Sequence, residues 1–302
     1  MTRRLTALAA VLALAACKKA EQQAAADSTA VPRDSFTVAD SFKTPESVLY
    51  DSVMDVYVVS NINGAPTAKD DNGFLSRVAP DGRVIELRWV DGAADSVTLN
   101  APKGMGIKGD TLFVADIDEV RLFDRTTGRA LGSRPVRGAT FLNDITVGPD
   151  GTVYVSDTGL KPDFSSSGTD AVYRFDARGN AVALARGRTL GSPNGLFAYE
   201  RGVVVVTFGS GEAYVLDSLG RRTDIQKPPH GQLDGVFMGA GGNLYASSWA
   251  DSSVVSLRAG DTEWRPIIRG MVSPADIGLD TRRNRILIPL FQQDRIEVRP
   301  LR

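Results

Sequence analysis

A unit of about 40 residues recurs along this chain. Each copy begins with a turn and a small or polar residue, continues into an apolar stretch, passes a turn containing Gly with Asp or Asn, and ends in a β-rich run. Three copies are clear in the sequence, at residues 102–116, 143–157 and 234–248. A repeat of this length built from short strands is typical of a β-propeller. Because equivalent residues of such repeats occupy equivalent places in the ring, the first residues of the copies should lie together.

The sequence contains six such openings, and we therefore predict an all-β fold with six blades. They are Glu46, Lys103, Asn143, Asn194, Asp234 and Ala275, at successive spacings of 57, 40, 51, 40 and 41 residues. The two long spacings contain extra turn-forming residues at 61–72 and 160–169. After the last opening, 285–290 and 295–298 supply strands for most of a blade, and the alternating segment 35–39 could complete the ring.

Composition places the chain among ordinary soluble globular domains. It has 302 residues, 42% hydrophobic and 24% charged, with a net charge of −1. The repeat extends from about residue 40 to the C-terminus, which favours one domain over residues 35–302, and we expect a monomer. The net charge gives no reason to expect a nucleic-acid partner.

The N-terminal segment has the pattern of a bacterial lipoprotein signal. Arg3 and Arg4 precede a short apolar stretch that ends in Leu14-Ala15-Ala16-Cys17, which resembles a lipobox. We therefore predict a signal peptide over 1–16, lipidation of Cys17 and a flexible tether over 17–34. Since Lys18 rather than Asp follows the cysteine, we expect the outer membrane, facing the periplasm, or the cell surface. The alternative is an ordinary signal peptide with an incidental cysteine.

Four of the six openings offer oxygen ligands at the same phase of the repeat. They are the carboxylates of Glu46 and Asp234 and the amides of Asn143 and Asn194. Oxygen ligands with two negative charges suit Ca²⁺, and Mg²⁺ less well, whereas zinc prefers histidine and thiolate. The alternative is that each of these side chains only satisfies the backbone of a turn. The sequence thus predicts a central metal site made of these four residues.

The same openings resemble a known family. Segments 45–51, 142–144, 192–196 and 233–236 are similar to the calcium-binding sequences of the senescence marker protein/gluconolactonase/luciferin-regenerating enzyme family, in the same order and at blade spacing. The resemblance covers the chain from about Thr44 to the end. It implies that Glu46, Asn143, Asn194 and Asp234 bind a divalent cation, usually Ca²⁺.

The resemblance also implies hydrolysis of lactones, phosphotriesters or related esters, with the metal polarising a substrate oxygen. Asp234 is then the expected base or nucleophile. Asp144, next to a ligand, is the reserve candidate, and its alternative role is to support the site or cap a turn.

Lys103 departs from the family pattern, because a cation among the ligands opposes the charge of a metal. It either binds an anionic group of a substrate or forms a salt bridge with Asp116, Asp118 or Asp144. His230 is the only histidine and lies in the loop before Asp234, where it could transfer a proton or be a bystander.

Aromatic residues at the predicted loop ends, Phe164, Phe208 and Trp249, could form an apolar rim for a substrate, or only pack in the core. The sequence has no Gly-x-Ser-x-Gly motif. Two functions remain open: a calcium-dependent lactone or ester hydrolase, and a non-catalytic propeller that binds a ligand or protein partner around a structural metal.

Overall fold

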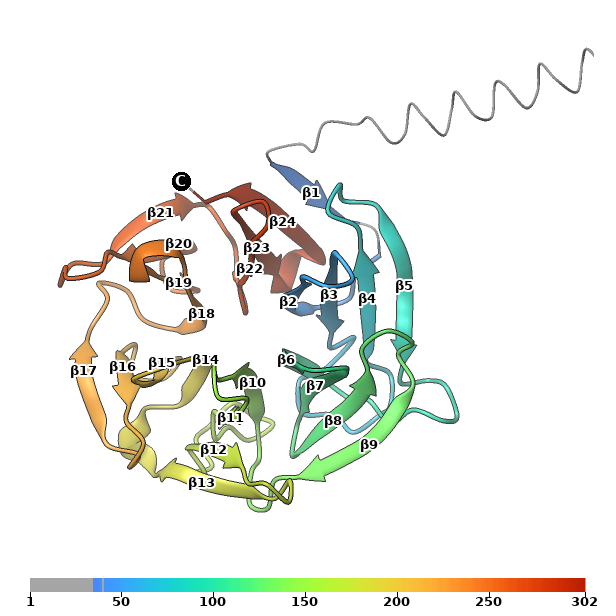
Figure 1. Cartoon of the computed structure of the whole chain (residues 1–302), viewed down its shortest axis with the longest axis horizontal. Coiled ribbons are helices and arrows are strands. Elements are labelled where there is room, and N and C mark those ends of the chain that lie inside the picture. Colours follow the sequence, from blue (N-terminus) through green and yellow to red (C-terminus); the bar gives the residue numbers. More distant parts are fainter. Residues whose placement is uncertain (1–34, 40, 302) are drawn as a thin grey trace, which may run out of the picture. The chain divides into compact units, whose positions relative to one another are not determined.

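The chain folds into six four-stranded antiparallel sheets arranged as blades around a central axis (Figure 1). The structure is a computed structural model, and it describes residues 35–39 and 41–301. This arrangement confirms the predicted six-bladed, all-β propeller. The predicted signal peptide, lipidation at Cys17 and tether lie outside the described residues.

Each blade has an innermost strand beside the axis and three strands that follow it outwards (Figure 1). The innermost strands are β2 (Pro45–Asp51), β6 (Pro102–Lys108), β10 (Leu142–Val147), β14 (Pro193–Tyr199), β18 (Leu233–Met238) and β22 (Gly278–Asp280). The second strands are β3 (Val56–Asn61), β7 (Thr111–Asp116), β11 (Val153–Asp157), β15 (Gly202–Thr207), β19 (Leu244–Ser248) and β23 (Arg285–Leu290).

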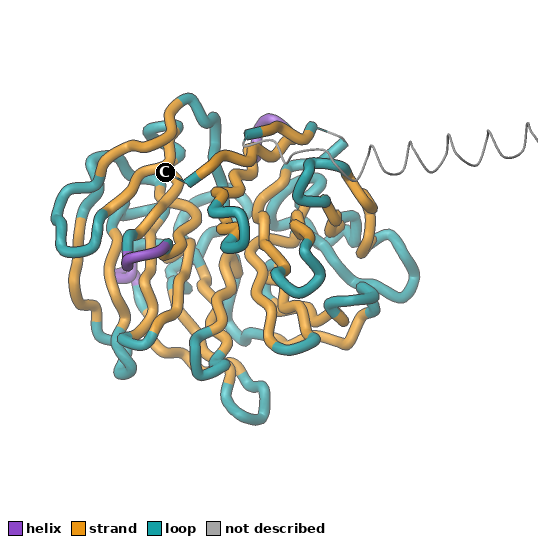
Figure 2. Tube along the Cα trace, turned by 45° about the horizontal axis from the view of Figure 1, so that its top comes forward, coloured by secondary structure: helices purple, strands orange, loops and turns teal. Residues whose placement is uncertain are grey.

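The third strands are β4 (Phe74–Val78), β8 (Glu119–Asp124), β12 (Ala171–Phe175), β16 (Ala213–Leu216), β20 (Ser253–Leu257) and β24 (Arg295–Pro300). The outermost strands are β5 (Val84–Asp91), β9 (Ala130–Pro135), β13 (Ala181–Arg186), β17 (Arg222–Gln226), β21 (Arg265–Arg269) and β1 (Phe36–Val38). The only helices among the described residues are three 3₁₀ turns, η1 (Arg188–Leu190), η2 (Ala240–Gly242) and η3 (Phe291–Gln293), the short purple pieces of Figure 2. No helix in this part of the chain is long and apolar enough to cross a membrane.

The first strand closes the ring. β1 pairs antiparallel with β24, with Phe36 opposite Val298, so the sixth sheet combines the two ends of the domain. This is the place predicted for segment 35–39. Closure of this kind pairs the sheet edge that the last blade would otherwise expose.

Apolar side chains of neighbouring blades form the core. Val155 and Tyr173 of one blade, for example, belong to the same buried cluster as Ala115 and Val120 of the blade before it. The second strands are buried throughout or nearly so, which explains their continuous apolar runs such as Val203–Val206. The outer strands are partly or fully exposed along most of their length, and even apolar side chains such as Val182 and Ile225 are exposed there.

The sixth innermost strand is shorter than predicted from its opening. β22 begins only at Gly278, three residues after Ala275. The preceding residues pair instead with the first blade: the Asp276 amide donates to the Glu46 carbonyl at 2.8 Å, and Ser47 and Asp276 form a parallel bridge. The last blade is therefore joined to the first through the backbone next to the axis.

Candidate functional site

A β-bulge opens five of the six innermost strands. In β10, Asn143 and Asp144 together oppose one residue of β11, because the register moves between Leu142 and Ile145. The same shift occurs at the start of β2, β6, β14 and β18. A bulge interrupts the strict alternation of side chains, so two consecutive residues can both serve the axis. The openings predicted from the sequence are the second residues of these strands.

Serines of two second strands connect an opening to the opening of the next blade. The Ser156 hydroxyl accepts from the Asp144 amide at 2.9 Å and donates to the Asn194 carbonyl at 2.7 Å. Ser247 accepts from the Gly235 amide at 2.9 Å and donates to the Ala275 carbonyl at 2.8 Å. These fully buried hydroxyls fix the backbone that carries the ring side chains.

Glycine follows the opening at places where neighbouring blades approach each other closely. A Cβ on Gly104 would lie 2.4 Å from the Asp144 Oδ1 atom, and one on Gly235 would lie 2.3 Å from the Ile277 amide nitrogen. No side chain fits at such distances. The sequence therefore needs glycine at these places for the six openings to converge.

The four predicted metal ligands have one property in common. Each is 3–4% exposed and carries one buried side-chain oxygen that has no hydrogen-bond partner; the residues are Glu46, Asn143, Asn194 and Asp234. In Asn143 the amide nitrogen donates to the Thr158 hydroxyl at 3.0 Å, which leaves Oδ1 as the free atom. A buried oxygen without a hydrogen-bond partner is energetically costly and needs an explanation. A bound cation is one of the few explanations that accounts for four such oxygens together. We refer to these four residues as the ring.

The ring differs from the metal clusters made of acidic side chains, histidine and cysteine. No group of three or more such residues suited to a metal ion is found in 35–39 or 41–301. The ring has only two carboxylates, and its other oxygens come from amides. These donors fit a hard cation such as Ca²⁺, which accepts amide and water oxygens beside carboxylates.

The ionised forms of the carboxyl groups at the axis are electrostatically unfavourable. Burial raises the pKa of Glu46 well above its usual value, and the charges of Asp234 and Asp276 raise it further. Burial likewise raises the pKa of Asp234, again with Asp276 adding to the effect. The Trp249 indole lowers the Asp234 pKa, although its N–H makes no hydrogen bond of standard geometry. A cation at the ring would relieve this repulsion.

Asp276 is the site residue that the sequence-based reasoning missed. It is 8% exposed, its Oδ2 accepts from the Ser47 hydroxyl at 2.5 Å, and burial raises its pKa to about 7. It follows the opening Ala275 by one residue, which is the place that Asp144 occupies in its own blade. An acidic residue at this second position in two blades is the signal that could have revealed it.

Asp144 lies where the sequence predicted, but both of its oxygens are engaged. Oδ1 accepts from the Ile145 amide and Oδ2 from the Leu196 amide, each at 2.6 Å. The contact with Leu196 connects its blade to the next. Burial, with the charge of Asp276, raises the pKa of Asp144.

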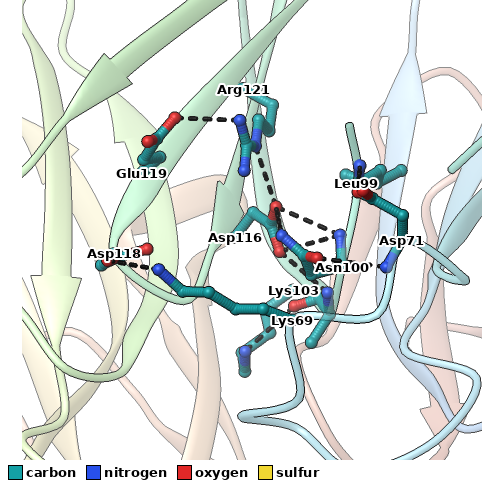
Figure 3. Close-up of polar contacts among 10 residues, drawn as sticks. Lys69, Asp71, Leu99, Asn100, Lys103, Asp116, Asp118, Glu119 and Arg121 are labelled. Atoms are coloured by element: carbon teal, nitrogen blue, oxygen red, sulfur yellow. Dashed lines mark hydrogen bonds and ion pairs between the residues drawn. The ribbon is translucent and has the colours of Figure 1, made fainter. Parts of the chain in front are cut away.

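Lys103 is 1% exposed (Figure 3) and forms none of the salt bridges considered from the sequence, with Asp116, Asp118 or Asp144. Its ammonium donates to the carbonyls of Pro66 and Ala101, each at 3.0 Å, and lies 4.7 Å from the centre of the Phe141 ring. Burial lowers the pKa of Lys103 to about 8, against the opposite influence of Glu46 and Asp116. Its role in this structure is to fasten loop 62–73 to the start of β6.

Further polar contacts fasten the same loop to the second blade, as Figure 3 shows. Lys69 forms an ion pair with Asp118 at 2.7 Å, and Asp71 accepts from the Leu99 amide at 3.1 Å. Asp116 accepts from the Asn100 amide group and from Arg121 at 2.9 Å. The longest insertion of the repeat is thus an ordered loop.

The predicted aromatic rim forms in part. Phe208 and Trp249 make an edge contact with ring centres 5.6 Å apart, and Trp249 lies 5.2 Å from Phe291, which the sequence did not single out. Phe291 also packs on the buried cluster Ile62, Ala101 and Ile117, so these residues, with Phe208 and Trp249, come from five blades. Phe164 is 60% exposed and contacts Phe141 instead.

The side chain of His230 lies beside Asp251. Its Nε2 atom lies 3.4 Å from an oxygen of Asp251, which also approaches Arg269 at 3.6 Å, and its side chain is half exposed. Among the described residues it forms no hydrogen bond or ion pair with Asp234. The structure therefore places His230 in the neighbouring loop without a link to the ring.

Comparison with known proteins places the fold but not the function. No protein-family model and no curated protein matches the sequence. A proposed gluconolactonase superposes with a TM-score of 0.65 at 18% identity, over 88% of this chain and 91% of that one. Streptogramin B lyase gives 0.60 at 9%, and a Staphylococcus aureus virginiamycin B lyase with quinupristin gives 0.59 at 15%, each over 87% of this chain and 97% of the other. The chain is similar to these proteins in fold.

Proposed function

We propose that the protein is a calcium-dependent hydrolase of a lactone or a related ester. The observation that supports this proposal is the set of four buried, unpartnered oxygens on Glu46, Asn143, Asn194 and Asp234. Ca²⁺ bound there would polarise a substrate carbonyl and stabilise the charge that develops on its oxygen. The likeness of fold to a proposed gluconolactonase agrees with this reaction class but does not establish it.

The chain's own residues supply three functions in this proposal. Asn143 and Asn194 present neutral amide oxygens, so the ring keeps about two negative charges. Asp234 has a raised pKa and would accept the proton of an attacking water as general base. Trp249, Phe208 and Phe291 would exclude water and bind the apolar part of the substrate.

A second candidate is a non-catalytic propeller whose metal is structural. It is favoured by the low exposure of the ring, 3–4% for each residue. Under this proposal Asp234 would only hold the metal. Anchoring through Cys17 is compatible with either function and stays a proposal.

The test joins metal binding to turnover. We expect Ca²⁺ to bind by calorimetry and to raise the melting temperature, since saturation to a hundred times the Kd stabilises by about 2.7 kcal/mol. Asn143→Ala should weaken Ca²⁺ binding, whereas Asp110→Asn, which changes a carboxylate that is 89% exposed, should not. Lactones, aryl esters and phosphotriesters should then be hydrolysed with Ca²⁺ and not with chelator.

The outcomes separate the candidates. If Ca²⁺ and Mg²⁺ neither bind nor change the melting temperature, the metal site is refuted. If Ca²⁺ binds but no substrate is turned over faster than by Asp234→Asn, the non-catalytic propeller is the correct function.

A further inference from the structure

The central channel contains a cavity of about 460 Å³, which lies on the side of the ring toward the C-terminal ends of the innermost strands. Its walls come from all six innermost strands or the residues beside them, and they are mainly apolar, with Leu49, Met105, Ile145, Val236 and Ile277 among them. None of the four ring residues lines it, and neither does any Lys, Arg or His. A volume of this size is within the range of small-molecule sites.

Asp276 supplies a free acceptor at the inner end of this cavity. Its Oδ2 accepts from Ser47, which also lines the cavity, but its Oδ1 has no hydrogen-bond donor among the residues that the structure describes. Asp144 is the other carboxylate in the lining, and both of its oxygens accept backbone amides. The cavity therefore contains one unsatisfied acidic oxygen, on a residue that is only 8% exposed.

Charge balance at the axis points to a cationic occupant. No ion pair in the described part of the chain involves Glu46, Asp144, Asp234 or Asp276, and the ammonium of Lys103 is directed to carbonyl groups. A divalent ion at the ring would balance Glu46 and Asp234, and two amide groups stabilise Asp144. Asp276 is left with one hydroxyl, and a buried carboxylate needs more than that to remain an anion.

We propose that this cavity is a binding site for an alkylammonium ligand, with the ammonium group on Asp276 and the apolar body along the channel. A second metal ion fits less well, because a hard cation needs six or more oxygens and this wall offers mostly carbon. An ammonium group needs only a few acceptors and gains a charge-assisted hydrogen bond from the carboxylate. The four inner-strand positions from Asp144 to Val147 span about 10 Å, which leaves room for a short alkyl chain.

The experiment compares n-hexylammonium with hexan-1-ol, which has the same alkyl chain but no charge. Calorimetry on the full chain in excess Ca²⁺ should show hexylammonium binding at least about tenfold more tightly, or about 1.4 kcal/mol. Asp276→Asn should remove this preference, whereas Asp110→Asn, with the same change in net charge, should keep it. Val147→Trp, which adds bulk at a lining position at the far end of β10 from Asp144, should weaken both ligands and serves if Asp276→Asn does not fold.

Three results would overturn the proposal. They are no binding of hexylammonium, equal binding of hexan-1-ol, and loss of hexylammonium binding when Ca²⁺ is added, which would place the ammonium at the ring. Since the measurement requires no turnover, a failed hydrolase assay leaves this test unaffected. The ring proposal is in turn unaffected if hexylammonium does not bind.

Discussion

Metal-free protein should become less stable as the pH rises from about 5 to about 7.5. The reason is Asp276, whose pKa is raised by burial from an ordinary 3.8 to about 7. Between these two values the folded protein keeps the proton and the unfolded chain releases it. The stability that protonated Asp276 contributes is therefore fully present below the pKa of this residue in the unfolded chain, and it is lost as the pH rises through its pKa in the folded protein.

The size of this effect follows from the separation of the two pKa values. A gap of about three units corresponds to about 4 kcal/mol for Asp276 alone, of which about 2.5 kcal/mol is lost between pH 5 and 7.5, and a domain of this size would lose roughly 5 °C in melting temperature over that window. Glu46, Asp144 and Asp234 also have raised pKa values and add in the same direction. Lys103 acts oppositely only above its folded pKa of about 8, so stability should be lowest near neutral pH.

The assay is urea unfolding of chelator-treated protein at several pH values in this window. The window avoids the region near pH 2, where Asp55, whose pKa is lowered to about 2 by Arg283, loses its stabilising charge. Asp276→Asn should flatten the pH dependence, and excess Ca²⁺ should reverse it, because the metal binds the deprotonated ring. Equal or greater stability of the metal-free protein at the higher pH would show that these carboxyl groups are not buried as the structure has them.

Three further substitutions test the framework of the site, two by urea unfolding and one by hydrogen exchange and proteolysis. Ser247→Ala leaves the Gly235 amide and the Ala275 carbonyl without their partner and should lower the free energy of unfolding by about 2–4 kcal/mol. The control Ser256→Ala, on the partly exposed face of β20, should lower it little. Equal losses in the two variants would contradict the connection between blades through Ser247. Gly235→Ala should cost more than about 2 kcal/mol, because its Cβ would meet backbone at 2.3 Å, and a neutral result would show that the blades can separate. Lys103→Met should increase hydrogen exchange and proteolysis in the loop that Lys103 fastens, and unchanged protection there would refute that role.

The fold could be predicted because its signals are local and repeated. Turn residues and short apolar runs recur in each blade, and one alternating segment near Phe36 was enough to predict the strand that closes the ring. The length of the sixth inner strand could not be predicted, because the backbone at Asp276 pairs with the first blade. That pairing connects residues more than 200 positions apart.

The site was predicted in its positions more than in its contacts. Repeat phase is sufficient to bring Glu46 and Asp234 to the axis, since the strands impose it. The partner of Lys103 is a carbonyl of Pro66, 37 residues earlier in an insertion, and no pattern marks a carbonyl as an acceptor. Phe291 was missed for the same reason, because its contact with Trp249 depends on how two loops meet.

The arrangement of charge at the axis constrains what the protein can bind. Four carboxyl groups lie within one buried region, and the one cationic side chain among them in the described part of the chain, Lys103, already donates to backbone carbonyls. Stability alone would be better served by apolar residues at these places, since buried charges without partners are costly. The bulged strands, the serine ties and the glycines nevertheless hold these groups in place. Bound cations would balance these charges and would explain the framework: a divalent ion at the ring and an organic ammonium in the cavity beyond it.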